Sequence, residues 1–413
     1  MKRGMVGVLV ANVVSVTGTR MSAVALPWFV LVSTGSVAKM GVVAAAETLP
    51  YVLACGLGGP LLDRLGYRRV SIVADAASAA AVLAIPFLGL NFSLLVGLVA
   101  VAGGLRGLGD TSKRVIFRQS VMTSGVDVTR ATSINDGLLR LTTLLGAPLA
   151  GLLIAAFDAQ TVLIIDAGTF GFGAAAIAIA VPAIASTGSA EPYLKALRGG
   201  FSYLRQDRLV AGLLVIFFCT NLFDSAYGSV LIPLWAKEVI GSPVALGLVS
   251  ASFAVGAVLG NVVFTVVAPR VPRFATYAVG FVIGGAPRFL VPAFTDEAWP
   301  LYLVSFIAGL GMASVNPIIG AVMFERVPEH MLARVQGLGT AVAWGGIPVG
   351  ALIGGWLGGI DLAVAFVVLG IGYLVVTLVP FTHPIWRQID IKPEPATAAV
   401  GEQAAAPQQP IRT

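Results

Sequence analysis

The sequence predicts an all-α membrane protein in which twelve transmembrane helices form two pseudo-symmetric bundles of six. Composition is the first observation behind this prediction. Hydrophobic residues make up 57% of the 413 residues and charged residues only 11%, whereas soluble domains carry about 25% charged residues. The number of long apolar segments and an internal repeat are the second and third observations.

Twelve segments are long enough to cross a bilayer, which takes about 20 mostly apolar residues. They are residues 5–32, 37–61, 70–90, 93–117, 130–156, 160–182, 209–235, 243–267, 274–294, 298–323, 332–357 and 361–381. Because these runs are continuous rather than alternating, they exclude a transmembrane β-barrel. The first run superficially resembles a secretory signal peptide, but it is too long and has no small-residue cleavage site, so we expect a retained first helix.

The distribution of basic residues predicts the orientation, because Lys and Arg accumulate in cytoplasmic loops. Twelve spans place both termini on one side, and the loops and ends of that side hold 20 of the 26 Lys and Arg residues. The other side holds Lys39 and Lys237, and the remaining four lie inside spans. We therefore expect a multi-pass protein of the cell (inner or plasma) membrane with both termini in the cytoplasm. The net charge of +6 reflects this bias and not a nucleic-acid surface.

The longest polar interruption lies between spans six and seven and divides the chain into two halves. It includes "YLKALRGGFSYLRQDR", which predicts a short amphipathic helix at the membrane surface. We expect a first six-helix bundle at residues 1–182, a cytoplasmic linker at 183–208 and a second bundle at 209–381. The tail at 382–413 is rich in Pro, Ala and Gln, which predicts a largely disordered cytoplasmic segment.

The two halves repeat at an offset of 206 residues. "ALPWFVLVSTGSVAKMGVV" from Ala25 aligns with "LIPLWAKEVIGSPVALGLV" from Leu231. Further aligned pairs are Gly103 with Gly309 and, where the offset becomes 200, Gly146 with Gly346 and Pro148 with Pro348. Their order along the chain indicates a duplication, and transporters built from parallel six-helix repeats bind substrate between the halves, near the membrane midplane.

The loop after span two carries the most specific motif. "GGPLLDRLGYRR" resembles the cytoplasmic loop motif of the major facilitator superfamily, and residues 1–381 as a whole are similar to that family. The resemblance implies a cytoplasmic gate in which an acid and several bases make contacts that break when the gate opens. The motif residues are Gly59, Asp63, Arg64, Gly66, Arg68 and Arg69. Tyr67 stands where many members carry a base, and we expect Arg68 or Arg69 to make the missing contact.

Other phrases narrow the resemblance. "GTRMSAVALPWFVLVSTGS", "AAAETLPYVLACGLGGPLLDRLGYRR" and "GLRGLGDTSKR" are similar to the macrolide-efflux and Tap-like branch of twelve-helix drug–proton antiporters. "LLGAPLAGLL" resembles a degenerate antiporter motif, in which Gly146, Pro148 and Gly151 would kink span five and pack it tightly on its neighbours. The resemblance implies a proton-coupled secondary transporter that exports amphiphilic or lipophilic drugs or natural products by alternating access.

Arg20 and Glu47 are the first candidates for proton coupling. A charge inside an apolar span is costly, so Arg20 needs a partner. Both residues are equally distant along the chain from the short loop near residues 33–36, so the helical rise predicts that they lie at one depth and pair. The pair is either a static clamp of the first hairpin or a coupling site in which Glu47 takes up a proton from outside and releases Arg20.

Intramembrane charges differ between the halves. At the offset of 206, Arg20, Glu47, Arg106 and Asp110 correspond to Ala226, Phe253, Met312 and Asn316. This asymmetry predicts proton handling in the first half and an apolar cavity wall in the second. Asp110 is expected to contact the gate bases or, alternatively, Arg106 one turn away. Asp224 in span seven is a second candidate for coupling or for binding a cation, and Arg288 is expected to extend toward the membrane surface.

The candidate cavity wall combines aromatic side chains with a few amides, which suits bulky lipophilic compounds, and an accessible carboxylate would favour cations. Helix packing is the alternative role of each of these side chains. The candidates are Asn12, Trp28, Tyr51, Arg106, Asn135, Asn221, Phe223, Tyr227, Phe253, Asn316 and Trp344.

Other functional classes lack their motifs. "GLRGLGDTSK" has Asp110 where a phosphate-binding loop requires Lys, so the sequence does not predict that ATP drives transport. The chain has only 2 histidines, so the sequence does not predict a metal site either. No nucleophile–base constellation predicts an enzyme. We expect no cofactor, with the proton gradient as the energy source. The expected partners are a small amphiphilic substrate, protons and membrane lipids, with a monomer as the default.

Three alternatives on the same fold stay open. A lipid or lysophospholipid flippase would have a lateral opening in the bilayer plane. A narrow-specificity exporter of one metabolite or siderophore would have a polar, closely fitting cavity. A receptor or sensor that no longer transports is the third, against which the retained Asp63, Arg64 and Glu47 argue.

Overall fold

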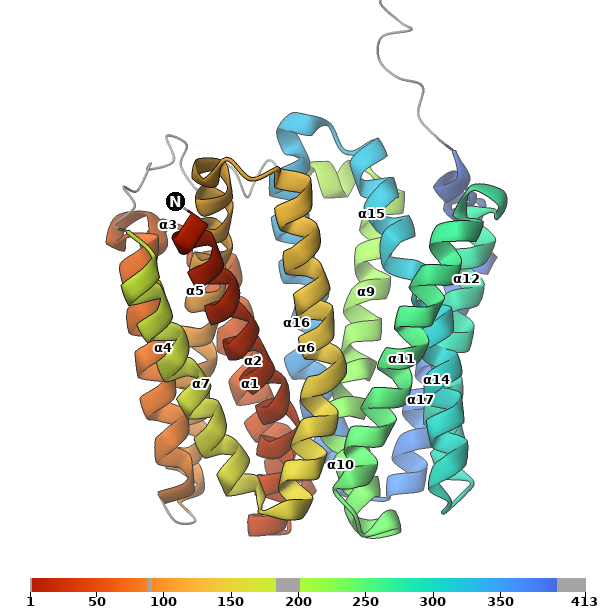
Figure 1. Cartoon of the computed structure of the whole chain (residues 1–413). Helices are drawn as coiled ribbons and strands as arrows, with labels where there is room; N and C mark the ends of the chain where they lie inside the picture. The colour runs from red at the N-terminus through yellow and green to blue at the C-terminus, as the bar shows by residue number, and fades with distance from the viewer. Residues whose placement is uncertain (1, 88–90, 183–200, 392–413) are drawn as a thin grey trace, which may run out of the picture.

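Twelve helices long and apolar enough to cross a membrane are found in the computed structural model, which describes residues 2–87, 91–182 and 201–391 (Figure 1). No strand occurs within those ranges. The predicted fold class is therefore confirmed. Of the predicted surface helix of the linker, at residues 193–208, residues 201–206 are helical, and residues 193–200 lie outside the described ranges.

The first bundle comprises six long helices and one short helix after the second span. They are α1 (Lys2–Thr34), α2 (Val37–Leu57), α3 (Gly59–Leu65), α4 (Tyr67–Ala84), α5 (Phe92–Ser124), α6 (Val128–Ala156) and α7 (Ala159–Ala180), with the 3₁₀ turn η1 (Ile85–Phe87) after α4.

The second bundle has more interruptions. Span seven consists of α9 (Arg208–Ala226), the π-helical segments η2 (Tyr227–Leu231) and η3 (Ala236–Ile240), and α10 (Ile232–Trp235) between them. The remaining helices are α11 (Val244–Val267), α12 (Arg273–Gly284), α13 (Ala286–Leu290), α14 (Ala298–Met312), α15 (Val315–Arg326), α16 (Glu329–Gly358) and α17 (Leu362–Thr382), with 3₁₀ turns η4 (Ala268–Arg270) and η5 (Val291–Ala293).

Acidic caps begin four of the spans. The side chains of Asp127, Asp158, Asp207 and Asp361 accept hydrogen bonds from backbone N–H groups in the first turns of α6, α7, α9 and α17. These caps satisfy donors that would otherwise lack a partner at the helix start. The hydrogen bonds from Thr161 lower the pKa of Asp158, because they favour the charged carboxylate.

The predicted repeat is visible in the helix crossings. A Cβ on Gly103 of α5 would collide with the carbonyl oxygen of Glu47 on α2, and a Cβ on Gly309 of α14 would collide with that of Phe253 on α11. Gly103 and Gly309 are counterparts, and so are Glu47 and Phe253. The α2–α5 and α11–α14 crossings are therefore equivalent, and glycine is what allows two backbones to approach this closely.

The two bundles touch tightly at one end. The start of α1 and the last residues of the described chain lie on the same side, at the top of Figure 1, which we call the terminal face. At the opposite face, a Cβ on Gly41 of α2 would lie 2.5 Å from the carbonyl oxygen of Ala351 on α16. A Cβ on Gly151 of α6 would lie 2.9 Å from the carbonyl oxygen of Pro243. Closer to the terminal face, a groove separates α6 from α11.

The first part of the predicted tail is folded. Residues Pro384–Asp390 form the 3₁₀ helix η6, in which Trp386 and Ile389 are buried. The Asp390 carboxylate accepts a hydrogen bond of 2.9 Å from the N–H of Phe274 at the start of α12. The chain from Lys392 onward lies outside the described residues, so its expected disorder stays a prediction.

Candidate transport site

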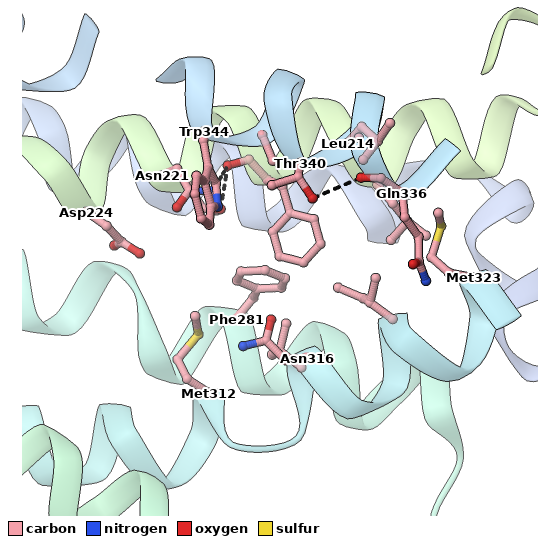
Figure 2. Close-up of a pocket in the computed structure, with 17 residues that line it drawn as sticks. Leu214, Asn221, Asp224, Phe281, Met312, Asn316, Met323, Gln336, Thr340 and Trp344 are labelled. Atoms are coloured by element: carbon pink, nitrogen blue, oxygen red, sulfur yellow. Dashed lines mark hydrogen bonds between the residues drawn. The ribbon is translucent and has the colours of Figure 1, made fainter. Parts of the chain in front are cut away.

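A cavity of about 480 Å³ lies inside the second bundle, between α9, α12, α14, α15 and α16 (Figure 2). It extends from Asp224 toward Leu213, Met323 and Gln336, on the parts of α9, α15 and α16 nearest the terminal face. Asp224 is the one charged residue among the described residues that line it. Its other lining side chains are aromatic, aliphatic, thioether, amide or hydroxyl, including Phe217, Phe281, Met312, Trp344, Asn221, Asn316 and Thr340.

Three of the predicted cavity residues, Asn221, Asn316 and Trp344, line this cavity. Tyr51 approaches from the first bundle, and its ring stacks on that of Trp344 with the centroids 6.0 Å apart. Phe253 lines the groove between α6 and α11.

The other predicted cavity residues lie elsewhere. Phe223 and Tyr227 pack against Tyr373 and Phe289, with ring centroids 5.6 and 4.9 Å apart. Trp28 packs against the main apolar core. Asn12 and Asn135 are half-buried on α1 and α6, outside the cavity.

Asp224 forms an ion pair with Arg288 of α13. The Arg288 side chain is only 9% exposed, whereas 36% of the Asp224 side chain is exposed. The expectation that Arg288 extends toward the membrane surface is therefore wrong. Asp224 lies close enough to form an ion pair with the guanidinium of Arg288, so Arg288 does not need water at the membrane surface as its partner.

Four aromatic rings surround the same guanidinium. The Cζ atom of Arg288 lies 5.0 Å from the ring centroid of Tyr227, 5.5 Å from that of Phe253 and 5.7 Å from those of Phe289 and Tyr373. Cations are attracted to ring faces at this range, more strongly where water is excluded.

Glu47 forms an ion pair with Arg106 of α5, and the expected pair of Glu47 with Arg20 is not formed. The two side chains of the observed pair are 17% and 10% exposed. The reason is the close α2–α5 crossing at Gly103, which turns Glu47 toward α5. Arg20 is an exposed residue of α1, and its Cβ is the atom that a Cβ on Gly146 of α6 would approach to 2.5 Å.

The Glu47–Arg106 pair lines a small pocket inside the first bundle. Ser22, Ser78 and Asp166 line the same pocket. Its volume of about 20 Å³ has room for about one water molecule. Asp166 is fully buried and accepts hydrogen bonds from Ser22 and Thr169. Two carboxylates and one guanidinium thus share an enclosed polar site, in which a proton on either acid would redistribute charge.

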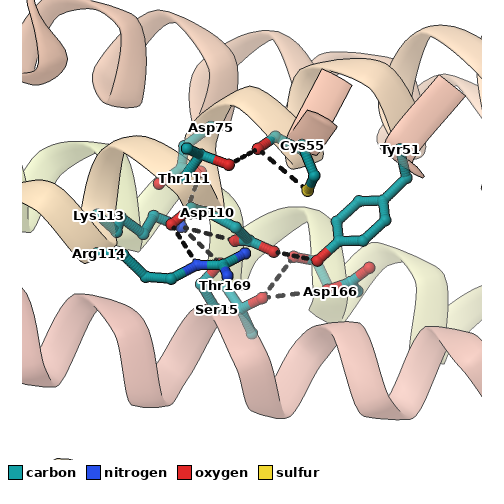
Figure 3. A network of polar contacts seen from close by, with 11 residues as sticks. Ser15, Tyr51, Cys55, Asp75, Asp110, Thr111, Lys113, Arg114, Asp166 and Thr169 are labelled. Carbon is teal, nitrogen blue, oxygen red and sulfur yellow. Dashed lines mark hydrogen bonds and ion pairs between the residues drawn. The ribbon is translucent and has the colours of Figure 1, made fainter. Parts of the chain in front are cut away.

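A second polar network lies closer to the terminal face (Figure 3). The Nζ of Lys113 lies 2.9 Å from Asp75 and 3.0 Å from the hydroxyl of Ser15, and the Lys113 and Asp75 side chains are each 2% exposed. Asp110 lies 3.9 Å from the same Nζ and accepts a 3.3 Å hydrogen bond from Tyr51. Of this network the sequence indicated Tyr51 and Asp110 but not the partners Lys113, Asp75 and Ser15, which come from three different helices. The i,i+3 spacing of Asp110 and Lys113 was the available signal.

The gate motif joins α3 to α4 through Gly66, whose φ of 82° favours glycine. Tyr67, which replaces the usual base, donates a hydrogen bond to Asp63. The expected contact from Arg68 is not formed, because its guanidinium donates to the carbonyl oxygens of Val181 and Ala178 at 2.6 and 2.7 Å. Arg68 thereby caps the last turn of α7, where carbonyls lack helical partners.

The remaining gate residues take no part in a closed gate here. Arg64 and Arg69 are exposed, and a Cβ added to Gly59 would meet no other atom within 4 Å. The expected contacts of Asp110 with gate bases or Arg106 are not found in this structure. Contacts that belong to a closed gate therefore stay predictions.

The Gly/Pro motif of span five packs α6 on two neighbours. Gly146 faces α1 at Arg20, and a Cβ on Gly247 of α11 would lie 2.9 Å from the Cα of Pro148. Gly151 faces Pro243 and Gly247 of the other bundle. The motif thus lies where the two bundles meet at the opposite face.

Comparisons with known proteins agree with this architecture. A family model described as Major Facilitator Superfamily matches residues 8–228 and 213–411. The chain is 28% identical to the multidrug efflux pump Tap of Mycobacterium tuberculosis. The match extends over 403 residues and covers 94% of this chain and 95% of Tap. It is 20% identical over 351 residues to macrolide efflux protein A of Streptococcus pyogenes, covering 82% of this chain and 85% of the relative. These relatives belong to the branch that the sequence phrases predict.

A solved structure shares the fold. The crystal structure of the nucleoside transporter NupG superposes with a TM-score of 0.73 at 14% identity, covering 91% of this chain and 98% of NupG.

Proposed function

The chain belongs to the Major Facilitator Superfamily, and on that premise we propose that it exports amphiphilic or lipophilic drugs or natural products in exchange for protons. One observation carries the proposal. An aromatic, apolar cavity with a single carboxylate lies in one bundle, and a separate enclosed acid–base site lies in the other. The relatives named multidrug efflux pump and macrolide efflux protein support the substrate class. The family and the relatives are transporters and not enzymes.

The proposed orientation places the terminal face in the cytoplasm. The excess of Lys and Arg on that side supports it. The glycine contacts at Gly41 and Gly151 then close the outer face, while the cavity extends toward the cytoplasm. In the proposed cycle the two bundles rock about the cavity, so that the outer contacts open while the gate motif closes.

Proton coupling is proposed for Glu47. A proton on Glu47 would remove the negative partner of Arg106, whose guanidinium would then turn to Asp166 in the same pocket. The positive charge of Arg20 on the neighbouring α1 would favour this shift by repelling Arg106. Asp224 remains a second candidate acid, because it is paired with a base and also opens on the cavity.

A lipid or lysophospholipid flippase is the second candidate function. The groove between α6 and α11, with a volume of about 460 Å³, is lined by both bundles and includes Asp136 and Arg140. A polar groove between bundles could guide a headgroup while the acyl chain stays in the bilayer.

Efflux assays test the proposal. A cationic dye and a macrolide are loaded into cells that express the wild-type protein or Glu47→Gln, with and without a protonophore. The proposal predicts energy-dependent efflux that is lost both in the variant and in uncoupled cells. Protonophore-sensitive efflux that survives the substitution would move coupling to Asp224. Failure of wild-type cells to export either compound would favour the flippase or a single-metabolite exporter.

A further inference from the structure

Asp224 faces two environments at once. Its Oδ1 accepts a hydrogen bond from Arg288, and its carboxylate also lines the cavity, where 36% of the side chain is exposed. Figure 2 shows the carboxylate at one end of the pocket, beyond Asn221 and Trp344. An ionised carboxylate has about four lone-pair sites, so one salt bridge leaves acceptor capacity for a second cation.

Arg288 does not depend on Asp224 alone. Its guanidinium lies among the rings of Tyr227, Phe253, Phe289 and Tyr373, at 5.0 to 5.7 Å. Its Nε is buried without a hydrogen-bond partner among the described residues. The rings can therefore stabilise part of the charge of Arg288 when a second cation also contacts Asp224. Because the hydrogen bonding of Arg288 is incomplete, its guanidinium still needs some attraction from that carboxylate.

The first bundle handles its arginine differently. Arg106 lines one pocket with two acids, Glu47 and Asp166. At the repeat position of Glu47, the second bundle has Phe253, which supplies a ring face to Arg288 instead of a negative charge. Asp224 is thus the acid that balances Arg288, and any cation that enters the cavity must compete for it.

We propose that Arg288 is a built-in competitor at a cation-binding subsite. A lipophilic monocation binds with its charge at Asp224, which weakens the Asp224–Arg288 pair and leaves the guanidinium to the four rings that already surround it. The apolar body of the cation lies against Phe217, Phe281 and Trp344. This inference rests on the proposed export function and names its substrate class. Arg288 then sets the selectivity: uncharged compounds use the same apolar wall without weakening this ion pair.

Equilibrium binding without any ion gradient tests this inference. The purified full-length protein in lipid nanodiscs is titrated with tetraphenylphosphonium, a permanent cation, and with uncharged triphenylphosphine oxide. Arg288→Met should bind the cation about tenfold more tightly, because Asp224 loses its resident partner. Asp224→Asn should bind the cation about tenfold more weakly. Both variants should bind the neutral compound like the wild type.

Matched variants make the outcome decisive. Glu325→Gln removes a carboxylate from the Arg273–Glu325 pair outside the cavity and should leave both affinities unchanged. If Asp224→Asn does not fold, the double variant Asp224→Asn with Arg288→Met removes both charges and should lose the preference for the cation. Cation binding that is unchanged or weaker in Arg288→Met overturns the inference. If the variants bind the cation as expected here but transport does not depend on a proton gradient, the proposed proton coupling is contradicted and the cation-binding inference is not.

Discussion

Glu47 on α2 pairs with Arg106 on α5, within the first bundle, while Arg20 on α1 lies against Gly146 of α6. The candidate proton site is therefore separated from the cavity in the second bundle, where Asp224 pairs with Arg288. At least one residue of each of these two ion pairs lines a pocket of its own bundle, but the pairs occupy positions that the internal repeat does not relate. This division gives the proposed coupling one site for protons and a separate one for substrate.

A double-mutant cycle tests the partner of Glu47. The variants are Glu47→Gln, Arg106→Gln, Arg20→Gln and the two doubles that contain Glu47→Gln, each compared by thermal denaturation in detergent. We expect a coupling energy of about 1–3 kcal/mol between Glu47 and Arg106, as for contacting residues, and near zero between Glu47 and Arg20. A larger coupling for the Arg20 pair would contradict the observed pairing.

The hydroxyl of Tyr67 is expected to replace the base of the usual gate motif. Tyr67→Phe removes the hydrogen bond to Asp63, which is worth about 1 kcal/mol, so the transport rate should fall about fivefold. Tyr67→Arg, which restores the base that many members carry, should retain transport. The rates are compared at equal expression in the dye-efflux assay. Equal rates for all three proteins would show that this contact has no role in gating.

Glycine at position 41 is expected to be necessary for closing the outer face. A valine there would bring its Cβ to 2.5 Å from a backbone oxygen of Ala351, which cannot move away as a side chain could. Gly41→Val should abolish transport and expose a cysteine introduced at Val37 to a membrane-impermeant thiol reagent, with Cys55 and Cys219 replaced. Gly97→Val is the matched control, because open space surrounds Gly97. Full transport by Gly41→Val would contradict a closing role.

The Lys113–Asp75 pair is expected to be structural. Both side chains are 2% exposed, and removing one partner of such a pair costs about 3–5 kcal/mol because the other charge is left buried. Lys113→Met should therefore lower the melting temperature in detergent strongly. The double variant Lys113→Met with Asp75→Asn should recover most of the loss. Equal destabilisation by the single and double variants would contradict this reading.

The fold class could be predicted from the sequence, because twelve apolar segments and their internal repeat can be recognised from composition and spacing alone. The equivalence of Gly103 and Gly309 was visible in the alignment, and both allow close helix crossings. The interruptions of span seven were not predicted, because the π-helical segments around Pro233 leave the apolar pattern intact.

The site was less predictable, for a geometric reason. Counting residues from a loop gives the depth of Glu47 and Arg20 but not the direction in which each side chain points around its helix. That direction is set by packing, here by the crossing at Gly103. The same limit applies to Arg288, whose depth suggested the membrane surface while its direction leads to Asp224. The sequence indicated the charges of Glu47, Arg20, Asp224 and Arg288, but only the structure showed their partners.

Proton movement in a reconstituted system tests the central claim most directly. Proteoliposomes that contain the wild-type protein or Glu47→Gln, with a pH-sensitive dye inside, receive tetraphenylphosphonium on one side. The account predicts that the cation gradient drives proton movement through the wild-type protein and that Glu47→Gln abolishes this movement while still binding the cation. Substrate-driven proton movement that persists in Glu47→Gln would contradict the assignment of coupling to the Glu47–Arg106 pair.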